Sequence, residues 1–396
     1  RSFIDMVSNV DAGKFNIFVC LPSYNIKYVE TLSPISTSII HFPYKWYTAN
    51  LGFDKDSQEI FKKIYREYNI DLIHVNTIML LDPIVASKED DIPSIIHVRE
   101  IISKDKHLTD LFNTSSNNII DLVQSNADYL IVNSLSTKRD FYIEYRTYHL
   151  YNTISKSYFE TRIKNKRDDI FKIGMLSSNI PKKGIYDFIE LAESYFKVAP
   201  EVQFILAGEK TTFIKQIEED LEQDSIEANL VFPGYISNPA DLLSSINVIV
   251  NFSHFAESFG RTIIEGMAAG AVPLVYNYGA LEELIENGVS GFKIEYKKWD
   301  QSIPILNKLR NNTFYFSEIQ NNAFVRCEQF KPSVFKVGLN NIYKDILNKR
   351  MPSHYSQSVY DEFNFDNYAN IINSDPIYID SEISKLAIAY FVYHFP

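Results

Sequence analysis

The sequence predicts an α/β protein of two domains that face each other across a cleft, each with a parallel sheet covered by helices on both faces. The 396 residues are more than one hydrophobic core usually accommodates. Short, almost continuous apolar runs alternate with segments of helical periodicity, which is typical of strands buried on both faces. The alternation is interrupted by the polar stretch 155–169, which we interpret as the linker between the domains.

The first domain is expected to span residues 1–153 and the second residues 154–330. The predicted strands of the first are 15–21, 71–75, 94–98, 129–132 and 148–151, with helices that include 57–68 and 136–144. The predicted strands of the second are 170–176, 202–207, 230–232, 248–251 and 272–276, with helices at 185–196, 213–221 and 261–269. Since strands and helices alternate, both sheets should be parallel.

The C-terminal region departs from this alternation. Residues 331–348 are predicted to form a closing helix, and residues 349–396 an appendage of unknown role. Within it, the run Leu386–Phe395 is too apolar to remain in water, so we expect it to cover part of the first domain. A contact with another subunit or with a membrane surface is the alternative, and basic residues near 331–350 would favour the membrane.

Composition excludes several classes of protein. A hydrophobic content of 45% with 28 Phe and 26 Tyr excludes global disorder. The net charge of −11 disfavours nucleic acid as a partner. The two cysteines cannot form a disulfide framework and suit a reducing compartment, so we expect a cytoplasmic protein. No apolar run reaches the roughly 20 residues that a membrane-spanning helix needs.

The most informative segment for function is 251–291. A predicted strand ends at Asn251, a loop carries Glu257, and a helix begins near Arg261 after Gly260. The first turn of a helix offers backbone N–H groups without internal partners and a partial positive charge, which suits a diphosphate. With Glu257 and Glu265 on either side of this turn, the segment could hold the two ends of a nucleotide sugar. The plainer alternative is a surface helix with two solvated glutamates.

Residues 257–270, ESFGRTIIEGMAAG, resemble the E-x7-E signature of family 4 glycosyltransferases, which are retaining enzymes with the GT-B fold of two Rossmann-like domains. The segment 279–291 is similar to the family's GG-x-x-E-x-I-x-x-G-x-x-G pattern. Weaker matches occur at 71–75, 128–134, 181–184 and 232–235, so the resemblance covers roughly residues 10–347.

This resemblance implies roles for individual residues. Glu265 would bind the ribose hydroxyls. Glu257 and Lys183 would be catalytic residues, with Glu257 at the hydroxyls of the sugar and Lys183 at the diphosphate. The further donor-binding residues that it implies are Phe259, Gly260, Arg261, Thr262, Ser178, Gly234 and Tyr235. It also implies no metal and no cofactor, because the donor is itself a nucleoside diphosphate sugar and the departing phosphate takes the proton of the acceptor.

The sequence departs from the family pattern at two site positions. Ser178 stands where the family has an arginine, with Lys182 as a candidate replacement or else a solvated loop lysine. Arg99 stands at the position of the family's catalytic histidine, and His97 precedes it by two residues on the same strand face. Both remain candidate catalytic residues, although a guanidinium cannot act as a base.

A third departure concerns the start of the first domain. Family members open with a strand and a Gly-rich loop, whereas residues 1–10 here correspond to the end of the following helix. We therefore expect the first domain to lack its first strand, as in an N-terminally truncated protein. The missing strand would leave apolar sheet edges exposed.

The function predicted from the sequence is transfer of a sugar, with retention, from a nucleoside diphosphate sugar to a hydroxyl of a glycan or lipid-linked acceptor, with peripheral membrane contact as an option. The alternative is a non-catalytic nucleotide-sugar-binding or scaffold subunit, favoured by Ser178, Arg99 and the absent loop. A sugar-nucleotide epimerase of similar fold is less favoured, because the segment around Glu257 and Glu265 matches the transferase signature.

Overall fold

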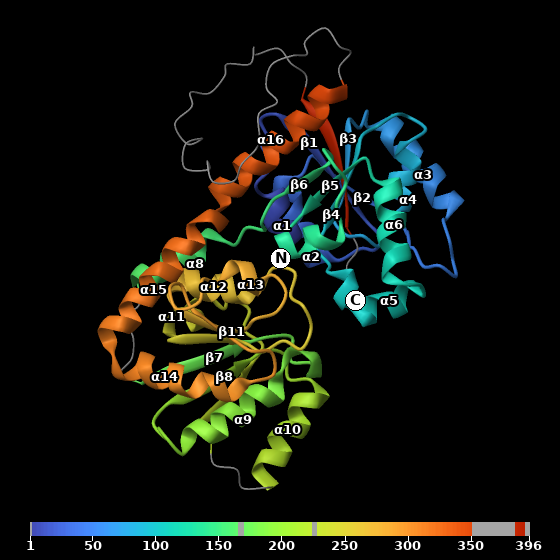
Figure 1. Ribbon diagram of the computed structural model, residues 1–396. Helices are drawn as coiled ribbons and strands as arrows, with labels where there is room; N and C mark the ends of the chain where they lie inside the picture. Colours follow the sequence, from blue (N-terminus) through green and yellow to red (C-terminus); the bar gives the residue numbers. More distant parts are fainter. Residues whose placement is uncertain (1, 165–169, 224–227, 351–384, 393–396) are drawn as a thin grey trace.

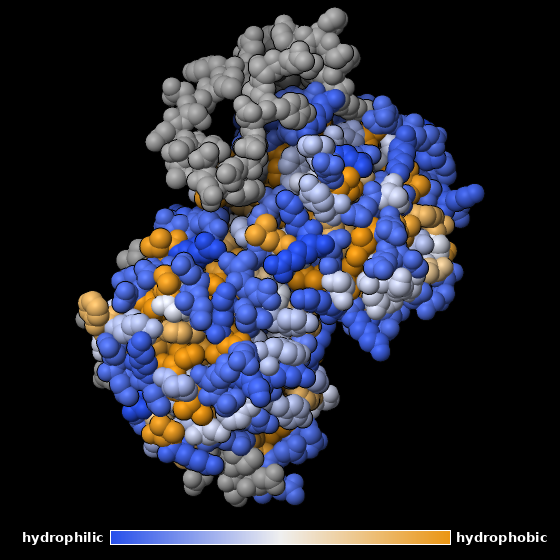
Figure 2. Space-filling view, viewed as in Figure 1, coloured by the Kyte–Doolittle hydropathy of each residue, from blue (hydrophilic) through white to orange (hydrophobic). Residues whose placement is uncertain are grey.

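The computed structural model describes residues 2–164, 170–223, 228–350 and 385–392. It consists of two α/β lobes joined side by side (Figure 1). Hydrophilic side chains cover most of the face shown in Figure 2, and the outline narrows where the lobes meet. Each lobe has one sheet whose strands all pair in parallel, which confirms the predicted fold class of two Rossmann-like domains.

The first sheet has seven strands in the order β2-β1-β13-β3-β4-β5-β6. Their bounds are β1 Phe15–Leu21, β2 Ser38–His41, β3 Leu72–Val75, β4 Ser94–Val98, β5 Tyr129–Val132, β6 Thr147–His149 and β13 Leu386–Phe391. The helices of this domain are α1 Ser2–Val7, α2 Ile26–Leu32, α3 Lys55–Glu67, α4 Asp82–Ser87, α5 Lys106–Phe112, α6 Ser116–Asn126 and α7 Leu135–Asp140. The strand β2 was not among those predicted.

Strand β13 corrects the expectation that the first domain lacks a strand. It lies in the centre of the sheet, where Ile388 is in register with Ile17 of β1 on one side and Leu72 of β3 on the other. Ile388 through Phe391 are completely buried. The appendage expected at 349–396 is therefore wrong for Leu386–Phe391, whereas 351–384 and 393–396 lie outside the described residues. A segment that is apolar on both faces suits a central parallel strand better than a cover over the domain.

The second sheet has six strands in the order β12-β11-β10-β7-β8-β9. Their bounds are β7 Lys172–Leu176, β8 Gln203–Ala207, β9 Leu230–Gly234, β10 Val248–Asn251, β11 Val272–Tyr276 and β12 Phe292–Ile294. The helices are α8 Lys156–Lys164, α9 Ile185–Phe196, α10 Thr212–Gln223, α11 Ala240–Ser245, α12 Arg261–Ala269, α13 Leu281–Leu284, α14 Ser302–Asn311 and α15 Thr313–Cys327.

Helix α8 corrects the interpretation of residues 155–169 as a linker. Its residues 156–164 are helical, and Tyr158 and Phe159 are buried in a core cluster with residues of α11 and α12. Two aromatic side chains at neighbouring positions anchor this short polar segment, because their burial outweighs the cost of ordering the charged residues around them. The rest of the stretch, 165–169, is outside the described residues.

Helix α16, Pro332–Arg350, leads from the second lobe back to the first (Figure 1). Phe335, Leu339, Tyr343 and Ile346 are buried together with residues of β1, β3 and β13. The chain thus passes between the lobes near residues 150–155 and again at α16. No helix in the described part of the chain is both long and apolar enough to span a membrane.

Candidate nucleotide-sugar site

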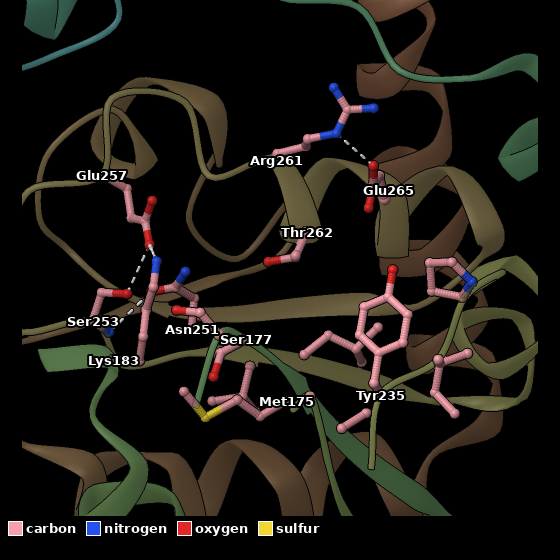
Figure 3. Close-up of a pocket in the computed structure, with 17 residues that line it drawn as sticks. Met175, Ser177, Lys183, Tyr235, Asn251, Ser253, Glu257, Arg261, Thr262 and Glu265 are labelled. Atoms are coloured by element: carbon pink, nitrogen blue, oxygen red, sulfur yellow. Dashed lines mark hydrogen bonds and ion pairs between the residues drawn. The ribbon is translucent and has the colours of Figure 1, made fainter. Parts of the chain in front are cut away.

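A cavity of about 280 Å³ lies in the second domain, between the carboxyl ends of β7, β8 and β10 and the start of α12 (Figure 3). Parallel α/β sheets commonly bind ligands at this edge. The cavity is lined by Met175, Leu176, Ser177, Ser178, Lys183, Ala207, Gly208, Tyr235, Ile236, Pro239, Val250, Asn251, Ser253, Glu257, Arg261, Thr262 and Glu265. Seven residues predicted from the sequence are in this set.

Helix α12 begins at the cavity wall. Gly260 caps it with φ +66°, and a Cβ there would lie 2.5 Å from Leu281 Cδ2, so this close approach requires glycine. The backbone bonds of the helix start with the N–H groups of Ile263 and Ile264, which donate to Gly260 O at 3.0 and 3.3 Å. The N–H groups of Arg261 and Thr262 precede this ladder at the positive end of the helix dipole, beside the cavity.

Glu257 is held by two donors on one wall of the cavity (Figure 3). Lys183 Nζ and Ser253 Oγ each lie 2.8 Å from its Oε1. Lys183 Nζ is also 4.4 Å from the centroid of the Phe255 ring. Because these contacts need no ligand, a cation and a carboxylate are already paired at the cavity wall.

Glu265 lies one helical turn into α12, and its side chain is only 1% exposed. Arg261 Nε donates to its Oε1 at 2.7 Å. The guanidinium also pairs with Asp5 of α1, with 2.5 Å between Nη2 and Oδ2. Burial lowers the pKa of Arg261, but the two carboxylates outweigh it and raise the pKa above its ordinary value.

His97 and Arg99 do not line this cavity; both belong to β4 or its end in the first domain. His97 is completely buried, and its Nδ1 is 3.3 Å from Nε2 of His74, whose Nδ1 is 2.7 Å from Tyr343 Oη. Burial, with the charge of Arg99, lowers the pKa of His74 to about 3 and that of His97 well below its usual value. Arg99 Nη1 donates to Asn152 at 2.8 Å, and burial lowers its pKa to about 10.

The remaining predicted donor-binding residues divide into two groups. Ser178 and Tyr235 line the cavity, and the Tyr235 side chain is exposed. Phe259 is buried and packs edge-on against Phe330, with ring centroids 5.5 Å apart, so its side chain supports the loop. Gly234 ends β9, where its carbonyl accepts a bond from Gly208 N at 3.0 Å.

Sequence inspection missed several residues around the cavity. Ser177 Oγ bonds Asn179 Oδ1 at 2.9 Å, which shapes the loop after β7. Ser253 is on the cavity wall, and its position four residues before Glu257 was the available signal. His254, three residues before Glu257, does not line the cavity, and its Nε2 lies 2.8 Å from Asp187 Oδ2 of α9.

The cavity lies in the part of the chain that a known family model matches. The family model described as Glycosyl transferases group 1 matches residues 157–324, which contain every cavity residue. The capsular polysaccharide biosynthesis glycosyltransferase CapM of Staphylococcus aureus is 24% identical over 181 residues, which are 46% of this chain and 47% of CapM. A poly(ribitol-phosphate) alpha-N-acetylglucosaminyltransferase of S. aureus strain COL is 28% identical over 153 residues, 38% of this chain and 30% of that protein. The matches thus span about half, or less, of these two relatives.

Solved structures show the same fold over most of the chain. HepE of Anabaena, solved with UDP-glucose, has a TM-score of 0.71 at 20% identity and covers 87% of this chain and 95% of its own. A glycosyltransferase of Rickettsia africae has a TM-score of 0.65 at 16% identity, with 84% and 99% covered. The solved structures show that the two lobes together have the GT-B fold, and residues 157–324 match the model of the group 1 glycosyltransferases.

Proposed function

We propose that this protein is a retaining glycosyltransferase that moves a sugar from a nucleoside diphosphate sugar to a hydroxyl of a glycan or lipid-linked acceptor. The observation that carries the proposal is that Lys183, Glu257, Glu265 and the start of α12 all line the same cavity. An anion seat between two carboxylates fits a molecule with a diphosphate in its middle and hydroxyl groups at both ends. The UDP-glucose bound to HepE has this arrangement, which supports the proposal.

In this proposal the diphosphate lies over the N–H groups of Arg261 and Thr262. Lys183 turns from Glu257 to the phosphate oxygens, and Glu257 then accepts hydrogen bonds from the sugar. Glu265 accepts hydrogen bonds from the ribose, while Gly234 and Tyr235 border the base. Ser178 donates to the diphosphate more weakly than the arginine of the family pattern would.

The transfer needs no protein nucleophile. The bond between the anomeric carbon and the phosphate oxygen breaks, and the acceptor oxygen bonds to the same face of that carbon. The acceptor proton passes to the departing phosphate. Lys183 and the positive end of α12 stabilise the charge on the leaving group. We propose that this suffices without a metal, so added EDTA should leave the rate of transfer unchanged, and rescue by Mg²⁺ after inhibition would contradict this.

The acceptor would approach from the first domain. Of the two candidates there, the geometry favours Arg99 over His97. Arg99 interacts electrostatically with Arg261 of the second domain and with Asp5. His97, by contrast, is completely buried within the first domain. A glycan or lipid acceptor is supported by the names of two relatives, CapM and an alpha-monoglucosyldiacylglycerol synthase of Acholeplasma laidlawii.

The test is a panel of UDP, GDP, ADP and their common sugar conjugates, read by thermal shift and by release of nucleotide on addition of glycan acceptors. A ligand at about 100 times its dissociation constant should stabilise the fold by about 2.7 kcal/mol. Glu265→Ala should abolish that shift, and Glu219→Ala, an exposed glutamate on α10, should not. No shift with any ligand would overturn the proposal.

The alternative is a subunit that binds the nucleotide sugar without turnover. The seclusion of His97 and the presence of Ser178 favour it. Binding with no sugar released, to water or to any acceptor, would support this alternative.

A further inference from the structure

We propose that Asp5 is a positioning residue that acts across the lobe boundary, through Arg261, on the ribose-binding carboxylate of Glu265. This inference rests on the proposed function, because it assigns Glu265 to the ribose. Asp5 is on α1 of the first domain, whereas Arg261 and Glu265 are one turn apart on α12 of the second. Figure 3 shows the Arg261 guanidinium above Glu265 at the edge of the cavity.

The contacts of Arg261 use both ends of its guanidinium. Nε donates to Glu265 Oε1 at 2.7 Å, and Nη2 donates to Asp5 Oδ2 at 2.5 Å. Nη1 lies 3.2 Å from Ser2 Oγ and 3.4 Å from Thr153 O, where the chain passes between the lobes. Since the guanidinium is planar and rigid, partners on its Nη atoms fix the direction in which Nε points.

Burial strengthens the electrostatic interactions among these three side chains. The side chains of Asp5, Arg261 and Glu265 are 22%, 19% and 1% exposed, so their charges are poorly screened by water. A carboxylate as buried as Glu265 needs a charged or hydrogen-bonding partner to remain ionised. It can keep its bond to Arg261 and still accept bonds from ribose hydroxyls, because its two oxygens offer about four lone-pair sites.

Asp5 also offsets two like charges. Arg99 follows β4 of the first domain and interacts electrostatically with both Arg261 of the second domain and Asp5. Without the carboxylate of Asp5, their repulsion would displace Arg261, and with it Glu265. The position of the first domain is thereby coupled to the binding of the nucleoside in the second.

The experiment measures affinity for UDP, GDP and ADP and for their 2′,3′-dideoxy analogues by calorimetry. For the nucleotide that binds wild type best, Asp5→Asn and Arg261→Lys should each weaken binding about tenfold, which corresponds to one impaired charged hydrogen bond. The same variants should change binding of the dideoxy analogue less than about twofold, because that analogue offers no ribose diol to Glu265. Asp56→Asn, an exposed carboxylate on α3, is the control for loss of one charge in the first domain.

The outcomes separate the inference from the proposed function. The positioning role would be overturned, with the donor site still in place, if Asp5→Asn weakened binding of the nucleotide and of its dideoxy analogue equally. It would also be overturned if Asp5→Asn bound the nucleotide with the same affinity as Asp56→Asn. Absence of binding by wild type to all three nucleotides would overturn the proposed function, and the inference with it. Recovery of affinity in a double variant, Asp5→Asn with Arg99→Gln, would support the part of Asp5 in offsetting the two arginines.

Discussion

Glu257 has two partners before any ligand arrives, and each would be redirected by the donor. Lys183 and Ser253 both contact its Oε1, so the carboxylate is oriented at the cavity wall before a ligand binds. If Glu257 binds the sugar hydroxyls, Glu257→Ala should leave the affinity for the free nucleoside diphosphate within about threefold of wild type. The affinity for the sugar conjugate should fall about 10- to 100-fold, which corresponds to the loss of one or two charged hydrogen bonds. Calorimetry with both ligands decides this, and equal losses would remove Glu257 from the sugar.

His74 and His97 give the protein a specific sensitivity to acid. Burial lowers the pKa of His74 to about 3 and that of His97 well below its usual value of about 6.5. Below pH 6.5 the unfolded chain therefore takes up protons that the folded chain does not, so stability falls as the pH falls. Each histidine should contribute about 1.4 kcal/mol of lost unfolding free energy per pH unit between pH 6 and pH 4.

Urea unfolding at pH 7, 6 and 5 tests this dependence. His74→Gln should reduce its slope, whereas His107→Gln, at an exposed position on α5, should leave it unchanged. Stability that is constant from pH 7 to pH 5 in the wild type would show that the two rings are not held neutral by burial.

At the scale of single elements, two glycines have a similar backbone conformation but differ in how closely other atoms pack against them. Both Gly184, at the start of α9, and Gly288 have positive φ, +73° and +76°. A Cβ on Gly184 would lie 2.0 Å from Phe252 O, whereas nothing lies within 4 Å of one on Gly288. The loop of Lys183 therefore packs directly on the loop that leads to Glu257.

Gly288→Ala should cost about 1 kcal/mol of unfolding free energy, from backbone strain alone. Gly184→Ala should cost roughly 3 kcal/mol or more and also weaken nucleotide-sugar binding, because Phe252 and Lys183 must move apart. Thermal unfolding with and without ligand measures both effects. Similar costs for the two variants would mean that the contact between the loops is unimportant.

At the scale of the whole molecule, the first domain depends on a strand from the other end of the chain. Ile388 of β13 is completely buried between Ile17 and Leu72. Ile388→Asp should destabilise the first domain by more than about 4 kcal/mol, since a charge would be buried without a partner. Val337→Asp, on the half-exposed face of α16, should cost less than about 1 kcal/mol.

Hydrogen exchange resolved along the chain would report which domain responds. In Ile388→Asp, protection should fall in β1 and β3 and persist in β7 and β10, because each sheet has its own core. Loss of protection in both domains at once would show that the lobes unfold as one unit, and unchanged protection in β1 would show that β13 is dispensable.

The two parallel-sheet domains, and seven of the residues that line the cavity, could be predicted without the structure. Apolar runs such as 248–251 and 272–276 coincide with β10 and β11, because strands buried on both faces leave this pattern without any knowledge of their neighbours. Glu257, Gly260 and Glu265 could be grouped because all three belong to one loop-and-helix segment whose geometry is local.

The contacts between segments far apart in the chain could not be predicted. The order of strands in a sheet depends on packing between residues far apart in sequence, so the placement of β13 between β1 and β3 had no local signal. The same holds for the contact of Asp5 with Arg261, 256 positions apart, and for that of His74 with His97, 23 positions apart. Burial, which sets the charge of such groups, is a property of the packed molecule and not of the residue.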